Sequence, residues 1–477
     1  MKYLTTIGLE VHVQLRTTSK MFCGCGTGFG APPNTQVCPV CLGYPGAMPV
    51  INEEAIRLTV TAGLMLDCTI PGRSEFDRKS YFYPDMPKNY QISQYDQPLC
   101  VGGGLDIEAD GVRKRIGITR IHLEEDVAKN VHFQAVSGVD FNRAGVPLME
   151  IVTEPDMESP EEAFAFLLAL KQVLLYAGVS DCDLEKGNMR CDVNSSIRSE
   201  GAASLGTKTE IKNLNTFKGV FNALKFELAR QREVLDAGGR VVQETRRWDM
   251  DSGATYSMRS KEDAHDYRYF PEPDLPPVEI GAGLVAAWRA ALPERPRQRR
   301  ERFAREYGIP DYDAGVLVAD KAVADFFEAS ARLAGNPKAV SNWVMTDLLR
   351  VLSEREIGVE SVALTPAALA ALVKLVESGA INMPTARLLF GELVEKGGDP
   401  ESMVRERGLG QVRDEGALER FVDEAIGANP KSVADYRAGK VAAAKFLVGQ
   451  VMKLSKGKAD PQKVGALIEG RLQKGSG

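Results

Sequence analysis

A long apolar run is missing from this sequence of 477 residues. No stretch reaches the roughly 18 uninterrupted apolar residues that a bilayer-spanning helix requires. The residues that follow Met1 also lack the charged region, apolar block and small-residue cleavage site of a secretion signal. We therefore expect a cytoplasmic protein without a membrane role.

Two common phosphate-binding motifs are absent as well. The sequence contains no Gly-x-x-x-x-Gly-Lys-Ser/Thr loop, and the glycines from Gly24 to Gly30 do not have the spacing of a dinucleotide-binding turn. An excess of positive charge is also missing, because the net charge is −6 whereas a dedicated nucleic-acid binder is usually basic. Any nucleotide or nucleic acid would therefore be held by an unusual site and by local basic patches.

The periodicity of the sequence changes along its length. A chain of 477 residues is too long for one hydrophobic core and predicts two to four domains. The part up to about Pro277 is rich in strand patterns, and from about Leu284 onward helical spacing dominates, for example over Val316–Leu333 and Pro366–Glu377. From about Gln411 the pattern predicts a further unit of short helices.

Half of the eight cysteines crowd one short segment. Cys23 and Cys25 are separated by twelve residues from Cys38 and Cys41, and two close pairs joined by a loop are typical of a tetrahedral zinc site. All four ligands would come from the protein, so this zinc would be structural; buried thiols are the alternative interpretation. The remaining cysteines sit singly among apolar residues and are expected in the core: Cys68, Cys100, Cys182 and Cys191.

The strand pattern Ile7–Leu15 places polar side chains on one face. Side chains alternate along a strand, so Glu10 and His12 point the same way, about 7 Å apart along the backbone. A carboxylate and an imidazole at this spacing can bind one cation or pass a proton. The polar face of an exposed edge strand is an equally good interpretation of the pattern alone.

Further carboxylates end or interrupt two other apolar strands. Glu124, Glu125 and Asp126 close the pattern that begins at Ile116, and adjacent anions raise one another's pKa unless cations neutralise them. Oxygen ligands with one imidazole favour magnesium or manganese, although acids are also common at a helix N-terminus. Glu150 lies inside the apolar run Pro147–Val152, where an unpaired carboxylate would be costly to bury.

Other segments combine charge with polar or aromatic side chains. Two later strands have a charged face, which indicates a hydrated cavity or charged ligands, with cations for phosphate and acids for metal. Their charged or polar residues are Arg190, Asp192 and Asn194 in one strand and Lys208, Glu210 and Lys212 in the other. The segments Arg78–Gln91 and Arg259–Pro271 interleave rings with basic groups, as base stacking and phosphate binding require. A packed Tyr/Pro loop is the alternative interpretation of the first.

Seven strings along the chain carry a resemblance to one family. They are Gly8–His12, His122–Asp126, Asp140–Gly145, Glu150–Asp156, Arg190–Asn194, Lys208–Asn215 and His265–Pro271. In this order they resemble the GatB family, the B subunits of the bacterial and organellar aspartyl/glutamyl-tRNA(Asn/Gln) amidotransferase, and the similarity runs from end to end. Some members of that family lack the four clustered cysteines, which agrees with a structural rather than a catalytic zinc.

The resemblance implies a reaction and a set of partners. Members of that family bind misacylated Glu-tRNA(Gln) or Asp-tRNA(Asn), transfer the γ-phosphate of ATP to the side-chain carboxylate, and let ammonia displace the phosphate. Ammonia comes through a tunnel from the amidase subunit, which hydrolyses glutamine, and a small third subunit straps the two together into a heterotrimer. The expected cofactors are therefore ATP, Mg²⁺ or Mn²⁺, and a structural Zn²⁺, with tRNA(Gln) or tRNA(Asn) as the nucleic-acid partner.

The resemblance also implies site residues. It places the metal on His12, Glu125 and Glu150, with Glu10 and Glu124 as further ligands or ammonia-guiding acids. Asp192 and Glu210 would suit a second, nucleotide-linked cation. Charge, more than the resemblance, suggests a group of contacts to ATP or to the tRNA acceptor end: Lys79, Tyr81, Asn142, Arg143, Arg190, Lys208 and Lys212.

The implied architecture is an α+β fold. It consists of a cradle domain on a mostly antiparallel sheet over residues 1–290, with the zinc segment at 23–41, a helical domain at 291–407 and a small helical tail that grips tRNA at 408–477.

Two other functions remain compatible with these patterns. One is a non-catalytic scaffold that delivers misacylated tRNA, and the other is an ATP-dependent ligase for a small carboxylic acid.

Overall fold

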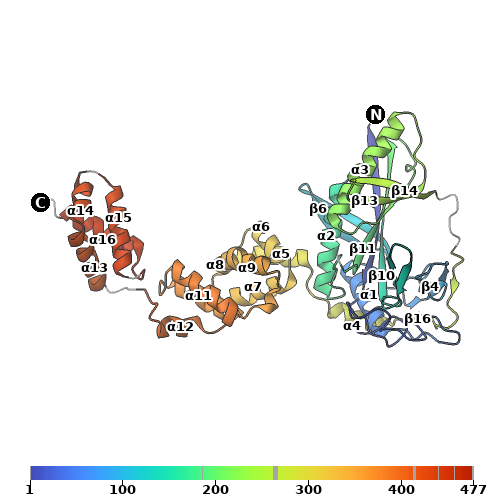
Figure 1. The fold of residues 1–477 in the computed structure, drawn as a ribbon, viewed down its shortest axis with the longest axis horizontal. Helices are drawn as coiled ribbons and strands as arrows, with labels where there is room; N and C mark the ends of the chain where they lie inside the picture. Colours follow the sequence, from blue (N-terminus) through green and yellow to red (C-terminus); the bar gives the residue numbers. More distant parts are fainter. Residues whose placement is uncertain are drawn as a thin grey trace. The chain divides into compact units, whose positions relative to one another are not determined.

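The computed structural model describes residues 2–184, 186–260, 267–411, 415–438, 440–455 and 457–474. The chain forms two compact units, Met1–Pro296 and Arg297–Gly477. The first combines a large sheet with helices, and the second is helical (Figure 1). The expected α+β class with a mostly antiparallel sheet is confirmed. The three-domain division stays a prediction, and the first unit extends to Pro296 rather than 290.

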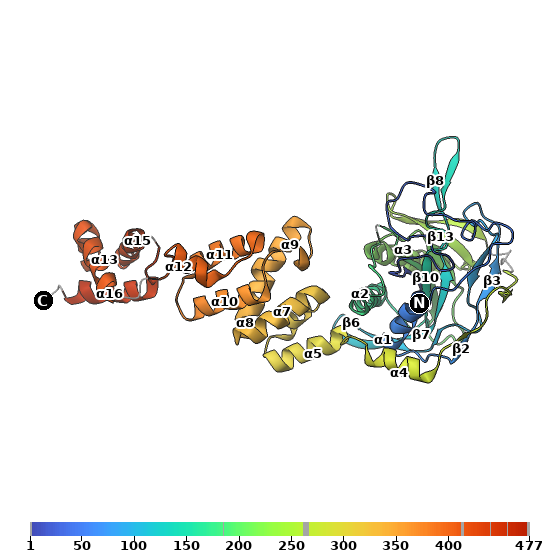
Figure 2. The same cartoon turned by 90° about the horizontal axis from the view of Figure 1, so that it is seen from below.

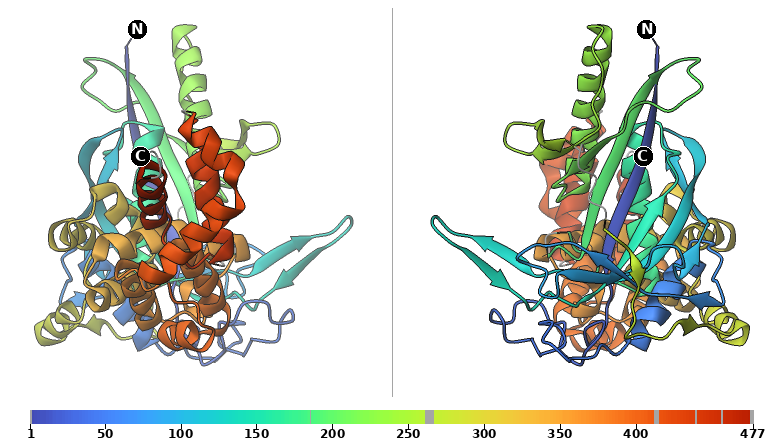
Figure 3. Two further views of the ribbon diagram at one scale, coloured as in Figure 1. Left: turned by 90° about the vertical axis from the view of Figure 1, so that its left-hand side faces the viewer. Right: turned by 90° about the vertical axis from the view of Figure 1, so that its right-hand side faces the viewer.

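A nine-stranded sheet organises the first unit, in the order β14-β13-β12-β11-β1-β10-β7-β5 with β6 also paired to β7. The strands are β1 (Tyr3–Gln14), β5 (Cys100–Val101), β6 (Gly104–Ala109), β7 (Val112–Glu125), β10 (Pro147–Thr153), β11 (Met189–Ser199), β12 (Thr209–Lys212), β13 (Glu244–Asp249) and β14 (Ala254–Ser260). Neighbours are antiparallel except β12 and β13, which are parallel. The long strands β1 and β11 are seen side by side in Figure 3.

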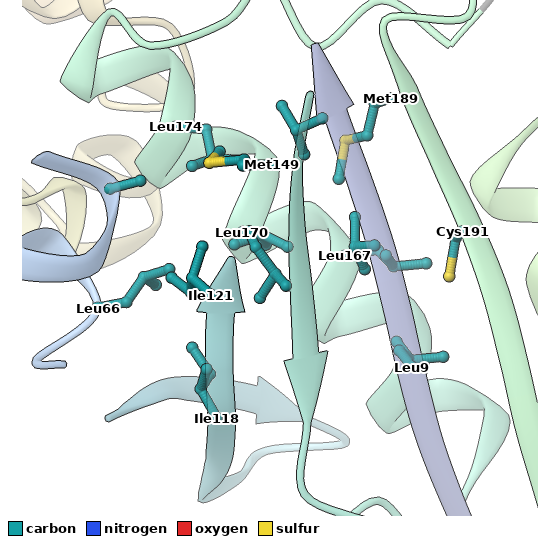
Figure 4. Close-up of a cluster of buried hydrophobic side chains, with 14 of the residues drawn as sticks. Leu9, Leu66, Ile118, Ile121, Met149, Leu167, Leu170, Leu174, Met189 and Cys191 are labelled. Atoms are coloured by element: carbon teal, nitrogen blue, oxygen red, sulfur yellow. The ribbon is translucent and has the colours of Figure 1, made fainter. Parts of the chain in front are cut away.

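Helices cover one face of this sheet. They are α1 (Glu53–Met65), α2 (Pro160–Ala177) and α3 (Phe217–Asp236). Leu167 and Leu170 of α2 pack against the apolar side chains of the sheet, including Leu9 and Met149 (Figure 4). Burial of one such side chain contributes about 1.5–3 kcal/mol. The alternate side chains of the same strands therefore point to the opposite face, which is where the polar residues gather.

The two ends of α2 are set by its caps. The Ser159 side chain accepts a hydrogen bond from the Glu162 amide, and Pro160 occupies the first turn, where its missing N–H costs nothing. The helix ends at Gly178, whose φ of 68° is a left-handed conformation that glycine adopts without steric cost. These caps fix the helix that lies across the apolar face of the central strands.

Smaller sheets lie around the main one. The first is formed by β15 (Phe270–Pro271), β3 (Asp77–Ser80) and β4 (Tyr90–Ser93), and the second by β2 (Arg73–Ser74) and β16 (Val278–Glu279). The third is a hairpin of β8 (Lys129–His132) and β9 (Ser137–Asp140), which projects from the body of the unit (Figure 2). Strand β4 lies close to β7, so that the first small sheet meets the polar face near the end of β7. The short helix α4 (Ala282–Ala290) follows β16.

The second unit contains two separate groups of buried apolar side chains. The first lies among α5 (Pro296–Tyr307), α6 (Asp311–Leu317), α7 (Lys321–Ala334), α8 (Pro337–Trp343), the π-helix η1 (Val344–Leu348), α9 (Leu349–Arg355), the 3-10 helix η2 (Val359–Ser361), α10 (Pro366–Glu377), α11 (Met383–Lys396) and α12 (Pro400–Glu406). The second lies among α13 (Glu415–Ala428), α14 (Pro430–Arg437), α15 (Ala442–Leu454) and α16 (Pro461–Lys474). Within the described ranges, no helix combines the length and apolar character of a membrane span.

Candidate active site and zinc site

A row of charged side chains crosses the three central strands of the main sheet. His12 of β1 lies directly opposite Glu150 of β10, and Glu150 lies directly opposite His122 of β7. Residues opposite each other in antiparallel strands point to the same face and lie within contact distance. Glu124 follows His122 by two positions along β7 and therefore shares this face.

The four side chains meet closely. The Nε2 atoms of His12 and His122 each lie 3.3 Å from Oε2 of Glu150. Each of them also lies 3.8 Å from an oxygen of Glu124, which is Oε1 for His12 and Oε2 for His122. Ser93 of β4 donates a hydrogen bond of 3.2 Å to Oε2 of Glu124. Glu124 and Glu150 are both buried, at 2% and 8% exposure.

Burial and charge act in opposite directions on these groups. Burial lowers the pKa of His122, but the Glu150 and Glu124 carboxylates outweigh it and raise that pKa to about 9. The pKa of His12 is raised in the same way, against its burial, by Glu150. Burial alone would raise the pKa of Glu150, yet the His122 and His12 imidazoles hold it well below its usual range. The carboxylates are therefore ionised and compensated by adjacent positive charge.

Three of these residues have the arrangement of a divalent-cation site. One atom from each of His12, Glu124 and Glu150 can be chosen such that the three atoms lie within 4.8 Å of one another. Carboxylate oxygens with an imidazole suit magnesium or manganese. The residues present therefore fit the metal that the sequence led us to expect.

The position of Glu125 differs from that expectation. Glu124 and Glu125 are neighbours on a strand, so Glu125 points away from the face that carries His122 and Glu124. Its Oε1 forms an ion pair with the Lys88 ammonium and accepts a hydrogen bond of 3.0 Å from the Ile92 amide. The structure therefore groups Glu124, and not Glu125, with His12 and Glu150, while the metal itself stays a prediction.

Lys79 and several tyrosines lie next to the row. Burial lowers the pKa of Lys79, but the nearby Glu124 carboxylate, with Glu150 adding to it, raises this pKa and keeps the ammonium charged. The Lys79 Nζ atom lies 5.0 Å from the centre of the Tyr267 ring, which contacts Tyr81 and Tyr269 edge-on. Lys79 therefore lies within the electrostatic influence of Glu124 and Glu150, and its contact to ATP or the tRNA acceptor end stays a prediction. The segment Lys261–Asp266 of the second aromatic stretch, which includes His265 and Asp266 of the matching string, lies outside the described residues.

The neighbouring strands extend the polar face. The Arg190 guanidinium donates a hydrogen bond of 2.8 Å to Oδ1 of buried Asp126. Glu10 accepts a hydrogen bond of 2.8 Å from the Asn194 side chain and lies two residues before His12 on the same face of β1. The face therefore alternates positive and negative groups next to the row.

The place expected for a second cation holds an ammonium group. Lys212 Nζ lies 2.7 Å from Oδ2 of Asp192 and 3.3 Å from Oε1 of Glu210. Burial lowers the pKa of Lys212, but Asp192 and Glu210 raise it above its usual range. The two acids are thus neutralised by the protein itself in this structure, and a second cation at this place stays a prediction.

Three of the expected ATP or tRNA contacts are not part of the row itself. The Nε atom of Arg143 lies 3.7 Å from Oδ2 of Asp126, the acid that also binds Arg190. Asn142 accepts from the Gln36 amide and donates to the Pro32 carbonyl, so it fastens the cysteine segment to the loop after β9. Arg143 donates to the backbone carbonyls of Val127 and Ala128. These side chains bind within the local fold, and their contacts to ATP or tRNA stay a prediction. Lys208 is exposed just before β12.

The four clustered cysteines converge. Sulfur atoms of Cys23, Cys25, Cys38 and Cys41 all lie within 4.8 Å of one another, and those of Cys38 and Cys41 are 3.9 Å apart. Zinc–sulfur bonds of about 2.3 Å in a tetrahedron place sulfurs about 3.8 Å apart. The hydrogen bond from the Cys23 thiol and the nearby Lys20 ammonium hold the pKa of the Cys41 thiol well below its usual range. The residues therefore fit a structural zinc ion.

A cavity of about 200 Å³ lies between this segment and the end of β7. Its lining includes Lys20, Cys41, Lys88 and Glu125. Lys20 and Lys88, which were not among the expected site residues, therefore line this cavity. Lys88 lies in the aromatic and basic loop noted above, but its pairing with Glu125 depends on the tertiary fold.

Comparison with known proteins identifies the class to which this fold and site belong. Residues 5–286 match the family model described as the GatB/GatE catalytic domain, and residues 325–472 match the model described as the GatB domain. The chain is 52% identical to the B subunit of the aspartyl/glutamyl-tRNA(Asn/Gln) amidotransferase from Caldicellulosiruptor saccharolyticus, covering 99% of this chain and 100% of that protein. The identity to the protein of the same name from Brevibacillus brevis is 52%, covering 98% of each. The chain belongs to the family of aspartyl/glutamyl-tRNA amidotransferase B subunits.

Proposed function

We propose that this chain uses ATP to activate the side-chain carboxylate of a misacylated tRNA and converts it into an amide. The substrate is Glu-tRNA(Gln), Asp-tRNA(Asn) or both, and the products are Gln-tRNA(Gln) and Asn-tRNA(Asn). This reaction belongs to the glutamine-hydrolysing carbon–nitrogen ligases. The observation that carries the proposal is the row His12–Glu150–His122, with Glu124 beside it, on the polar face of the sheet.

The row and its neighbours have the charges that phosphoryl transfer needs. His12, Glu124 and Glu150 would hold Mg²⁺ or Mn²⁺, which when bound neutralises charge on the phosphate oxygens. The ammonium of Lys79, whose side chain is half-buried, supplies a second positive group next to those carboxylates. Tyrosine rings around Lys79 offer flat surfaces against which a base can stack. Lys79 and Tyr81 are accordingly our candidates for contacts to ATP or the tRNA acceptor end.

Two substrate steps take place on this face. An oxygen of the substrate carboxylate forms a bond to the γ-phosphorus while the bond from that phosphorus to the ADP oxygen breaks. Ammonia then forms a bond to the carbonyl carbon while the bond from that carbon to the phosphate oxygen breaks. The proton that ammonia loses passes to a carboxylate of the face, for which Glu124 and Glu10 are the candidates.

Ammonia and tRNA require partners. We infer that ammonia is delivered by a glutamine-hydrolysing amidase subunit, that a small third subunit joins the assembly, and that the helical tail from residue 408 contacts tRNA. Zinc in the cysteine cluster has a structural role, because four thiolates leave no open position.

The test is an assay of the assembled heterotrimer with ATP, glutamine and each misacylated tRNA. We expect ADP formation that depends on misacylated tRNA, and we expect Glu150→Gln to abolish it while Glu108→Gln on exposed β6 does not. ATP cleavage driven by free glutamate or aspartate would instead indicate a small-acid ligase. A complex that binds misacylated tRNA without cleaving ATP would indicate a scaffold.

A further inference from the structure

His122 occupies a position around the carboxylates that mirrors the position of His12. Each Nε2 atom is 3.3 Å from the same oxygen of Glu150 and 3.8 Å from one of the two oxygens of Glu124. The register explains this symmetry, because Glu150 on β10 lies between a histidine on β1 and a histidine on β7. Both imidazoles therefore approach the same two carboxylates, although the group of ligand atoms that all lie within 4.8 Å of one another contains His12 and not His122.

His122 is also the more enclosed of the two imidazoles. Its side chain is 6% exposed, whereas that of His12 is 21% exposed. Its Nδ1 atom is buried and has no hydrogen-bond partner within the described part of the chain. Buried polar side-chain atoms normally have a partner. Because Nδ1 has none among the described residues, a hydrogen bond at this atom does not explain why a histidine occupies this position. The interactions of the ring are made through Nε2, which faces the carboxylates.

We propose that His122 is a ligand of the same divalent ion as His12, Glu124 and Glu150, and that this second imidazole makes the site select Mn²⁺ over Mg²⁺. The inference rests on the proposed function, because it assumes that these carboxylates hold a metal. Mg²⁺ prefers oxygen ligands, whereas imidazole nitrogen is accepted more readily by first-row transition ions. Two nitrogens with carboxylate oxygens therefore move the preference towards Mn²⁺.

The direct test counts the nitrogens bound to manganese. Electron spin echo envelope modulation of the full-length chain loaded with one Mn²⁺ reports each coordinated imidazole. We expect two nitrogens in the wild type and one in His122→Gln. We also expect His122→Gln to reduce the ratio of Mn²⁺ to Mg²⁺ affinity, from competition titrations, by at least about tenfold.

A matched control is His132→Gln, which removes an exposed imidazole that bonds to Ser137 on the β8–β9 hairpin. It should leave both the nitrogen count and the affinity ratio unchanged. One nitrogen in a tightly bound wild-type complex would overturn the inference and leave the proposed metal site standing. Failure of the wild type to bind Mn²⁺ or Mg²⁺ would overturn both. If His122→Gln does not fold, the wild-type nitrogen count still decides.

Discussion

Adjacent Glu124 and Glu125 should respond in opposite ways to the same substitution. Oxygens of Glu124 lie 3.8 Å from both imidazoles of the row, and one of them belongs to the metal-binding group. Loss of an outer partner of a metal ligand weakens metal binding roughly 10–100-fold, so loss of a ligand itself should exceed about 100-fold. For Glu124→Gln we therefore expect a loss of more than about 2.7 kcal/mol in Mn²⁺ binding.

Glu125→Gln should change stability instead. Its carboxylate is 3% exposed and pairs with Lys88, whose side chain is itself only 12% exposed. Glutamine keeps an oxygen for the Ile92 amide but leaves the ammonium without its counter-charge. Breaking a buried ion pair costs about 3–5 kcal/mol, so the free energy of unfolding should fall by about 3 kcal/mol while Mn²⁺ affinity stays within about threefold.

Two measurements separate these outcomes. Free Mn²⁺ is followed by its electron paramagnetic resonance signal during titration, and stability is followed by urea unfolding of the same samples. The exposed Glu108→Gln variant is the control and should stay within about 0.5 kcal/mol of the wild type in both. The reverse pattern, with metal binding lost in Glu125→Gln and retained in Glu124→Gln, would refute the assignment of faces along β7.

Three further predictions concern other parts of the chain. Elemental analysis should find about one zinc per wild-type chain and none in Cys38→Ser; zinc-free wild-type protein, freshly purified and reduced, would contradict the site. Lys212→Met should add a second, weaker Mn²⁺ site between Asp192 and Glu210, measured as stoichiometry; two sites already present in the wild type would contradict this reasoning. Burial would raise the pKa of Glu328, but arginines led by Arg302 lower it from 4.5 to about 2, a shift worth about 3 kcal/mol. Urea unfolding should show that Glu328→Gln loses this amount at pH 7, and that the difference from wild type disappears as the pH falls from about 4.5 towards 2; a pH-independent difference would contradict it.

The features that follow from local periodicity could be predicted from the sequence. Alternation along the strands placed Glu10 and His12 on one face, and the ladder between β1, β10 and β11 has that arrangement. The helical spacing over Pro366–Glu377 likewise predicted α10, which has these bounds. The same alternation separates Glu124 from Glu125, because neighbours along a strand point to opposite faces.

Other features depend on contacts between distant residues. Asn142 and Arg143 look available for a ligand in the sequence, yet their donors bind backbone carbonyls that only the fold brings near. Lys212 likewise carries the charge of a phosphate contact but neutralises two acids. The helical pattern Val316–Leu333 is interrupted because the Asp320 side chain caps a new helix, α7, by accepting from the Val323 amide. Charge and periodicity do not reveal which partner a side chain finally takes.

The asparagine contacts around the cysteine segment have an evolutionary consequence. The Asn34 side chain donates to the Val139 carbonyl and accepts from the Phe141 amide, while Asn142 binds both Pro32 and Gln36. The side chains of Asn34 and Asn142 thus hold the cysteine segment against the loop after β9 through hydrogen bonds that involve no sulfur atom. The two asparagine side chains would therefore keep this segment attached in a relative that lacks the thiols.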